Sequence, residues 1–183
     1  MRITILLIAI LFLTGCTVSD PLPVLTETPF SKIRPDDFQV EYYWETGALP
    51  PPYFYSYTIT IGPGALGEII FVADYKDEGP PIWVEKIAIS DAELDDLYVR
   101  IFDMSLVEES WQQTDDIPDG GSANKLSVTA YGQDFSIPSY VADEEQAQAA
   151  RVLFEYIEGL VSQEIWEKLN TLHDDYVREH EED

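Results

Sequence analysis

Apolar and polar residues alternate along four stretches in the first half of the chain. From Phe38 to Glu45 every second residue is apolar, which is the period of a half-buried β-strand. Similar patterns predict strands over 53–61, 68–75 and 82–89, with a Pro-Pro-Pro break at 50–52. Parallel strands need a crossover of a dozen or more residues, and these connections are shorter. The four strands should therefore pair as antiparallel hairpins.

Helical spacing appears later in the chain. Ser90 and Glu93 match a capping box at the start of a first helix, and Asp143 is a cap for a second. Residues 125–130 and 134–137 lie between them and predict a hairpin around Gly132-Gln133, with a type II′ turn. The second helix is expected to bury Ala149, Val152, Tyr156, Ile157 and Leu160, and after a bend at 159–162 a third carries Ile165, Leu169, Leu172 and Tyr176.

The resulting order, β-β-β-β-α-β-β-α-α, predicts an α+β fold. The simplest way to bury the apolar stripes is an antiparallel sheet of about six strands with two to three helices packed on one face. We assign residues 36–183 to this single domain, which ends in an acidic C-terminal helix.

The first 16 residues follow a different pattern. Arg2 and the free amine precede an apolar run over 3–13. This run is much shorter than the ~20 residues of a membrane-spanning helix, and it is typical of a signal peptide. Leu13-Thr14-Gly15-Cys16 follows, and it resembles the lipobox of bacterial lipoproteins. The alternative is an uncleaved apolar start with an incidental cysteine.

The resemblance implies that residues 1–15 are a removable signal peptide and that Cys16 carries a diacylglyceryl group on its thiol. Two or three acyl chains anchor a protein stably where one would not. The protein would then lie in the cell envelope on the extracytoplasmic side. The anchor would be in the outer face of the cell membrane, or in the outer membrane if the host has two.

Residues 16–35 contain four prolines among threonines and serines, with no helical or strand period. This composition predicts a semi-extended tether between the anchor and the domain. The alternative is that Leu22, Val24 and Leu25 dock on the domain as an edge strand.

The charge balance limits the partners. The chain has 35 acidic residues against 10 Lys and Arg, a formal net charge of −25. A surface this negative repels nucleic acid and anionic lipid headgroups, so we expect no nucleic-acid partner. Attachment to a membrane must then come through the N-terminal lipid anchor.

Two sequence motifs resemble known sites and fail on their context. Residues 62–67 match G-x-G-x-x-G, but a strand-like stretch follows where a dinucleotide site needs a helix, so we predict a hairpin loop and no cofactor. An EF-hand loop beginning at Asp115 would place Ile117 and Leu126 at ligand positions. Asp115, Asp116 and Asp119 remain open as a weak divalent-cation site; the alternative is a solvated acidic loop.

Catalytic candidates are few. His173 and His180 lie in a charged C-terminal helix, there is no G-x-S-x-G motif, and Cys16 is assigned to the anchor. We therefore assign no catalytic, cofactor-binding or metal residue. A pair of carboxylates could still act as in glycosidases, but 35 acidic residues give no means of selecting two.

Tyr43 and Phe54 are the candidate ligand-facing aromatics, because each is out of phase with the expected core positions of its strand. The alternative is that they pack across strands. We expect an extracytoplasmic lipoprotein with a non-enzymatic binding domain for a protein, a peptide or a glycan. The alternatives are a carboxylate-dependent hydrolase and a passive acidic envelope protein.

Overall fold

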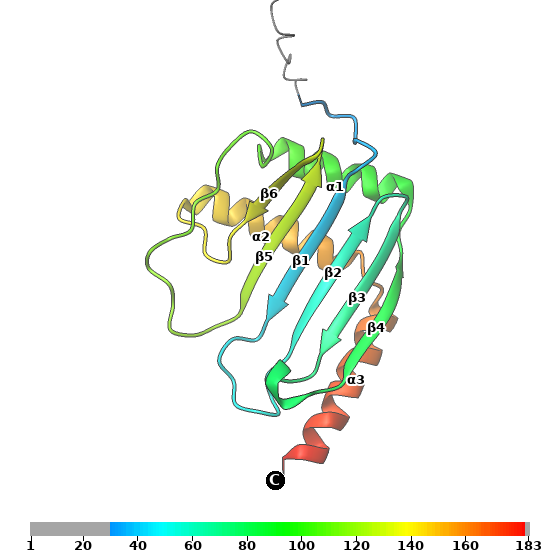
Figure 1. Cartoon of the computed structure of the whole chain (residues 1–183), viewed down its shortest axis with the longest axis vertical. Coiled ribbons are helices and arrows are strands. Elements are labelled where there is room, and N and C mark those ends of the chain that lie inside the picture. Colours follow the sequence, from blue (N-terminus) through cyan, green and yellow to red (C-terminus); the bar gives the residue numbers. More distant parts are fainter. Residues whose placement is uncertain (1–29, 182–183) are drawn as a thin grey trace, which may run out of the picture.

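A computed structural model describes residues 30–181, with the side chain of Glu78 excepted. It contains one antiparallel sheet of six strands in the order β4-β3-β2-β1-β5-β6, with three helices on one face (Figure 1). The elements are β1 (Gln39–Glu45), β2 (Ser56–Gly62), β3 (Leu66–Val72), a short 3-10 helix η1 (Lys76–Glu78), β4 (Ile82–Ala88), α1 (Asp91–Asp103), β5 (Ala123–Ala130), β6 (Gln133–Ile137), α2 (Glu144–Gly159) and α3 (Gln163–His180). The predicted α+β fold and its element order are confirmed.

The strand register explains why one face of the sheet is buried. Val40 of β1 lies opposite Ile61 of β2 and Val128 of β5, and Tyr42 lies opposite Ile59 and Leu126. These residues point to the helices and are almost completely buried. Because side chains alternate along a strand, the residues between them face away from the helices. We call these two surfaces the covered face and the open face.

The hairpin loops follow local backbone chemistry. The G-x-G-x-x-G segment joins β2 to β3 with Gly62 opposite Leu66, so the predicted hairpin loop is confirmed. The β5–β6 turn was predicted as type II′, and this was wrong. Both of its loop residues, Tyr131 and Gly132, have positive φ (56° and 69°), which is the type I′ geometry.

The predicted caps are present. The Glu93 amide donates to Ser90 Oγ (3.2 Å) and the Ser90 amide donates to Glu93 Oε2 (2.8 Å), which completes the capping box of α1. The Gln146 amide donates to Asp143 Oδ1 at the start of α2. The bend at 159–162 is also confirmed, because α2 ends at Gly159 and Ser162 caps α3.

The buried face of α2 differs from the prediction. Its buried residues are Ala150, Leu153, Phe154 and Ile157, whereas Val152 is 51% exposed. The ring of Phe154 stacks on Tyr42 of β1, with centroids 5.0 Å apart. This contact with the sheet turns the helix by about one residue from the face that periodicity suggested, because a wide apolar stripe does not define its own centre.

Residues 30–35, which we assigned to the end of the tether, contact the domain. The Phe30 ring packs edge-on against Tyr131 and Phe135. Tyr98 and Tyr131 both donate hydrogen bonds to the carbonyl of Ser31, and Arg34 pairs with Asp95 of α1. The packed part of the described chain therefore includes these residues.

Candidate functional site

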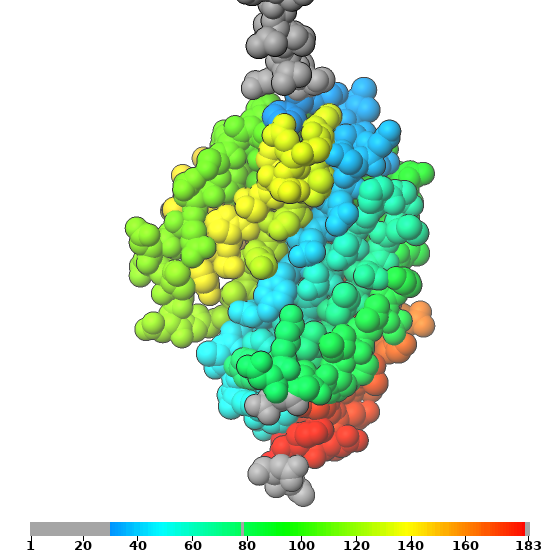
Figure 2. All heavy atoms as spheres, viewed as in Figure 1, coloured from blue at the N-terminus to red at the C-terminus, as the bar shows by residue number. Residues whose placement is uncertain are grey.

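The open face of the sheet is not covered by any of the three helices. In the view of Figure 2 the side chains of the strands themselves form this surface. Its centre is polar, with Glu41 and Tyr43 of β1 flanked by Thr58 and Thr60 of β2 and by Lys125 of β5. Its margin at β3 and β4 is mostly apolar, interrupted by the ion pair between Glu68 and Lys86. The open face therefore has two chemically different parts.

Tyr43 lies on the open face, as its phase in β1 predicted, and it is partly exposed. Its hydroxyl donates to Glu45 Oε2 (2.5 Å), and Lys125 Nζ lies 5.4 Å from the centre of its ring. Burial, followed by the hydrogen bond to Glu45, raises the pKa of Tyr43 to about 12. Its ring is thus held between a cation and a carboxylate.

Phe54, the other candidate aromatic, lies just before β2 and is only 7% exposed. Its ring stacks on Tyr75, with centroids 4.0 Å apart. Both rings form part of the wall of a pocket of about 380 Å³ beside the loop 118–121. The structure therefore separates Phe54 from Tyr43 and places the two in different surroundings.

The apolar margin of the open face lies on β3 and β4. Leu66, Ile82 and Val84 are 74%, 59% and 51% exposed, and the half-buried Ile70 lies directly opposite Val84. We call these four residues the apolar margin. β4 is also the last strand of the sheet, so one side of its backbone has no neighbouring strand among residues 30–181. Exposed apolar side chains next to a free strand edge are a feature of binding surfaces and of aggregation-prone edges.

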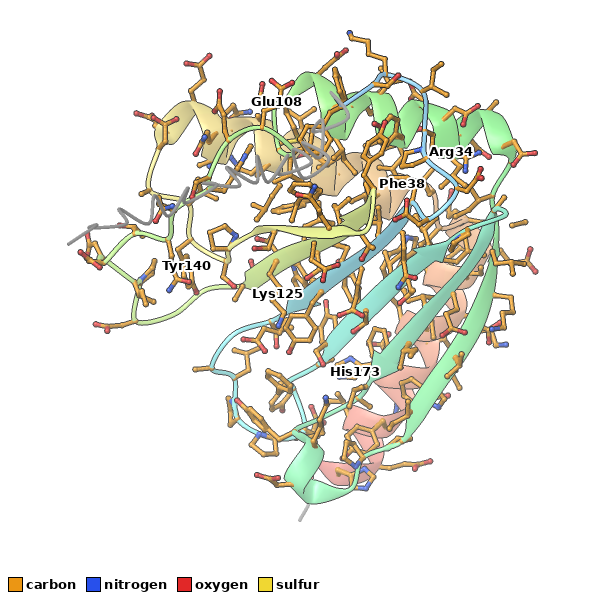
Figure 3. The ribbon with its side chains drawn as sticks, turned by 45° about the horizontal axis from the view of Figure 1, so that its top comes forward. Arg34, Phe38, Glu108, Lys125, Tyr140 and His173 are labelled. Atoms are coloured by element: carbon orange, nitrogen blue, oxygen red, sulfur yellow. The ribbon has the colours of Figure 1, made fainter. Side chains whose placement is uncertain are left out.

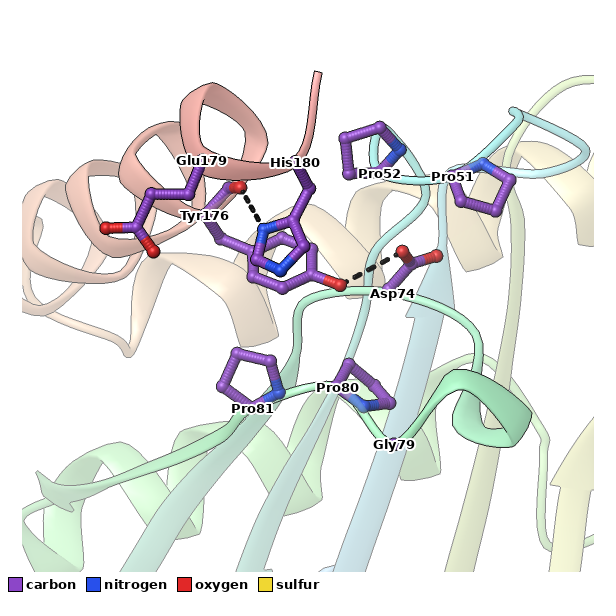
Figure 4. A pocket seen from close by; sticks show the side chains of 9 residues that line it. All are labelled: Pro51, Pro52, Asp74, Gly79, Pro80, Pro81, Tyr176, Glu179 and His180. Atoms are coloured by element: carbon purple, nitrogen blue, oxygen red, sulfur yellow. Dashed lines mark hydrogen bonds between the residues drawn. The ribbon is translucent and has the colours of Figure 1, made fainter. Parts of the chain in front are cut away.

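A second site lies where β4 begins. An open pocket of about 560 Å³ is lined by the end of α3 and by the two proline pairs 51–52 and 80–81 (Figure 4). Asp74, Tyr176, Glu179 and His180 supply its polar groups. We call it the α3 pocket. Pro81 belongs to its wall and immediately precedes Ile82, so the pocket adjoins the end of the β4 edge.

Asp74 is the buried acid of the α3 pocket, with 2% of its surface exposed. Its Oδ1 accepts from the Tyr75 amide (2.7 Å), and its Oδ2 accepts from the Tyr176 hydroxyl (3.2 Å). The rings of Tyr176 and His180 stack at 4.2 Å, and His180 Nδ1 lies 2.8 Å from the Tyr176 carbonyl. These contacts fix the aromatic side of the pocket.

His173 lies one turn earlier on α3 and points toward the sheet (Figure 3). Its ring packs on Tyr55 and Phe71, and its Nε2 is buried without a hydrogen-bond partner among the described residues. Burial lowers the pKa of His173, while the backbone of Pro52 and the charges of Asp174 and Asp74 oppose the shift. His173 is therefore packed into the domain.

Paired carboxylates were the catalytic alternative left open by the sequence. The α3 pocket contains two acids, Asp74 and Glu179, but Figure 4 shows the Glu179 carboxylate pointing away from Asp74, with the rings of Tyr176 and His180 between them. The carboxyl groups of Glu93 and Asp96 have lowered pKa values, because they accept hydrogen bonds from Ser90 and Arg100 respectively. A general acid requires the opposite shift.

A third polar cluster lies under the covered face. The hydroxyls of Tyr42 and Tyr57 both donate to Glu158 Oε1 at 2.7 Å, and Trp166 Nε1 donates to the Glu158 carbonyl. Burial, followed by contact with Glu158, raises the pKa of both tyrosines well above the usual value. This cluster joins β1 and β2 to the end of α2, and it is part of the packing between sheet and helices.

The three aspartates of the acidic loop are not gathered into one group in the structure. Over residues 30–181, no group of three or more His, Cys, Asp or Glu side chains is arranged to hold a metal ion, so Asp115, Asp116 and Asp119 do not converge. Asp119 lines the pocket that contains Phe54, and Asp116 lines a neighbouring one.

The signal peptide, the lipobox residues Leu13, Thr14 and Gly15, the anchor Cys16 and the docking alternative for Leu22, Val24 and Leu25 all lie outside the described residues. Among residues 30–181, none of the helices combines the length and apolar character needed to cross a membrane. A comparison of the sequence with models of known protein families and with curated proteins found no match.

Sequence reasoning missed the α3 pocket. Asp74 was counted as part of a strand over 68–75, although β3 ends at Val72. The available signal was the two proline pairs, 51–52 and 80–81, which mark rigid segments that could form walls. Nothing in the sequence indicated that α3 would bring Tyr176 and His180 between them.

Proposed function

We propose that this chain is a lipid-anchored extracytoplasmic binding protein whose domain holds an extended segment of a protein or peptide along the free edge of β4. The observation that carries the proposal is the apolar margin beside this edge. It combines unpaired backbone groups of a strand with exposed side chains on the same side of the sheet.

An extended peptide can contact both the unpaired backbone edge of β4 and the exposed apolar side chains beside it. Its backbone can continue the antiparallel ladder, and its alternate side chains can cover Ile82 and Val84. A glycan has no regular donor and acceptor series to match a strand edge. A second copy of the chain would bring together two domains that each carry a large negative charge, which disfavours pairing.

The hydrolase alternative receives less support. The two acids of the α3 pocket do not face each other, and Asp74 is engaged by two donors of the protein itself. A passive acidic protein would have no need of exposed apolar side chains beside a free strand edge.

The anchor rests on the lipobox resemblance at 13–16 and on the acidity of the chain, since an acidic domain does not adhere to anionic lipid. Replacement of Cys16 with Ser should leave the precursor unlipidated and uncut at this site. Metabolic labelling with a fatty-acid analogue and the mass of the product measure this. Normal processing and labelling of Cys16→Ser would contradict the anchor.

The binding surface can be tested in intact cells with the full-length chain. A photoreactive phenylalanine analogue replaces Val84 in one variant and Val152 in another. Val152 is a matched control, because it is also 51% exposed but lies on α2. We expect a discrete adduct only at 84, whose cross-linked peptide maps by mass spectrometry to an extended segment of one partner.

Ile82→Lys should remove that adduct, because a charge on the neighbouring open-face position blocks strand addition. Equal adducts at 84 and 152, or no adduct at 84, would overturn the binding proposal. An adduct of twice the chain mass would assign the edge to self-association instead.

A further inference from the structure

We propose that the α3 pocket binds a single organic cation, the ammonium group of a lysine-like side chain or the guanidinium of an arginine-like one. This inference goes beyond strand addition at β4, because it concerns a different surface and a ligand of defined charge. It does not require that a peptide pair with the strand edge.

The first argument is the state of Asp74. A buried carboxylate is costly unless it is paired with a positive charge. Asp74 accepts only from a backbone amide and a tyrosine hydroxyl, and no Lys or Arg among residues 30–181 forms an ion pair with it. Each of its oxygens can accept a further hydrogen bond. A cation entering the pocket would supply the missing charge.

The second argument is the position of α3. The helix ends at His180, and Tyr176, Glu179 and His180 of its last turn line the pocket, so the negative end of the helix dipole lies near it. Glu179 is exposed on the rim and adds a full negative charge. The helix end and the rim acid therefore make the surroundings of the pocket more negative, and Asp74 is the acid in its wall.

The third argument is the shape of the walls. Pro51 and Pro52 form one side and Pro80 and Pro81 another, while the stacked rings of Tyr176 and His180 lie between them (Figure 4). Proline and aromatic surfaces suit the methylene stem of a lysine or arginine side chain, and an aromatic face attracts its charged end. Free metal ions would gain nothing from these apolar walls.

The charge of the whole chain acts in the same direction. A net charge of −25 concentrates cations near the surface and repels anions such as phosphates and carboxylates. Within that general attraction, the pocket selects for a cation on a short apolar stem.

The test uses the full-length protein in detergent micelles and three small probes. Nα-acetyl-lysine N-methylamide presents the charged side chain without a longer peptide. Nα-acetyl-norleucine N-methylamide is its uncharged counterpart, and 1,4-diaminobutane represents a free diamine. All are too short to add as a strand at β4. Ligand-observed NMR and calorimetric titration should show the lysine probe binding at least tenfold more tightly than the norleucine probe.

Asp74→Asn should weaken binding of the lysine probe by at least tenfold. Glu164→Gln is the matched control, because it removes the same charge at the opposite end of α3 and should leave binding unchanged. If Asp74→Asn does not fold, Glu179→Lys is the second variant. It places a cation at the mouth of the pocket, so it should also weaken binding of the lysine probe.

Tighter binding of 1,4-diaminobutane would identify a free polyamine as the ligand source, and tighter binding of the lysine probe would identify a peptide side chain. Both support a cation site. Equal binding of the lysine and norleucine probes, or equal losses in Asp74→Asn and Glu164→Gln, would overturn it. Neither result bears on the photo-crosslink at position 84, so the two proposals can fail separately.

Discussion

The covered and open faces of the sheet are built from alternate residues of the same six strands, yet they differ in almost every physical property. On the covered face Val40, Tyr42 and Ile59 are completely buried. One residue further along each strand, Glu41, Tyr43 and Thr60 lie on the open face and contact polar or charged neighbours. Stability is therefore concentrated on one face, which leaves the other free to change for binding.

The contrast is not simply apolar against polar. The covered face contains the Glu158 carboxylate with its two tyrosine donors, and the open face contains the apolar margin at β3 and β4. The Glu158 carboxylate on the covered face is satisfied by partners within the chain. The exposed apolar groups on the open face have no such cover within residues 30–181, which is why we assign them to a ligand.

Matched truncations of one residue on each face should give the largest difference in the free energy of unfolding. Ile59→Ala on the covered face should lower the free energy of unfolding by about 2–5 kcal/mol, because it leaves a cavity between sheet and helices. Val84→Ala on the open face should change it by only about 0.5 kcal/mol. Urea denaturation followed by tryptophan fluorescence measures both values.

The opposite ordering, or equal losses, would show that the apolar margin contributes to the fold rather than to binding. Val152→Ala, with the same exposed fraction as Val84 but on a helix, separates loss of strand preference from loss of burial.

Much of this two-faced sheet could be predicted from alternation alone. The period-two pattern from Phe38 to Glu45 determined which β1 residues are buried, and the caps at Ser90 and Asp143 located two helix starts. These features depend on neighbours within a few positions in the sequence. Local chemistry is sufficient for them.

The features that sequence did not predict depend on distant partners. The phase of α2 is set by the contact of Phe154 with Tyr42, more than a hundred positions away. Asp74 becomes a pocket residue only because Tyr176 of α3 reaches its carboxylate. Phe54 is buried because Tyr75 stacks on it. None of these pairings leaves a periodic signal in the chain.

The tyrosines of the covered face should make the domain sensitive to alkali. Tyr42 has a raised pKa, so above the usual value of 10.0 the unfolded chain loses a proton that the folded chain keeps. Stability is then fully present below pH 10 and falls as the pH rises. Tyr42→Phe should flatten this fall by about 1.4 kcal/mol per pH unit between pH 10 and 12, at a cost of about 1 kcal/mol at pH 7 for the lost hydrogen bond to Glu158.

Tyr53→Phe is the surface counterpart for this measurement. Its hydroxyl donates to Glu181, which raises the pKa of Tyr53, but the side chain is exposed and solvent screens the interaction. The flattening in Tyr53→Phe should therefore be clearly smaller. The free energy of unfolding is measured from denaturation curves between pH 9 and 12. If its dependence on pH is the same in Tyr42→Phe and Tyr53→Phe, burial under the helices is not the cause of the alkaline loss of stability.

His173 should produce the smallest effect, and at the acid end. Its lowered pKa means that below about pH 6.5 the unfolded chain binds a proton that the folded chain resists, so its contribution to stability is present above that pH and is lost below it. The ring is only half-buried, so the slope should stay well under the 1.4 kcal/mol per pH unit of a fully buried group. His173→Phe keeps the packing on Tyr55 and Phe71 and removes a nitrogen that has no partner among the described residues. The free energy of unfolding of this variant should therefore depend less on pH between 7.5 and 5.5, with no loss at pH 7.5. Thermal denaturation across this range measures the difference, and an unchanged slope would mean that the imidazole is hydrated in solution and that the covered face is less closed at α3 than at α2.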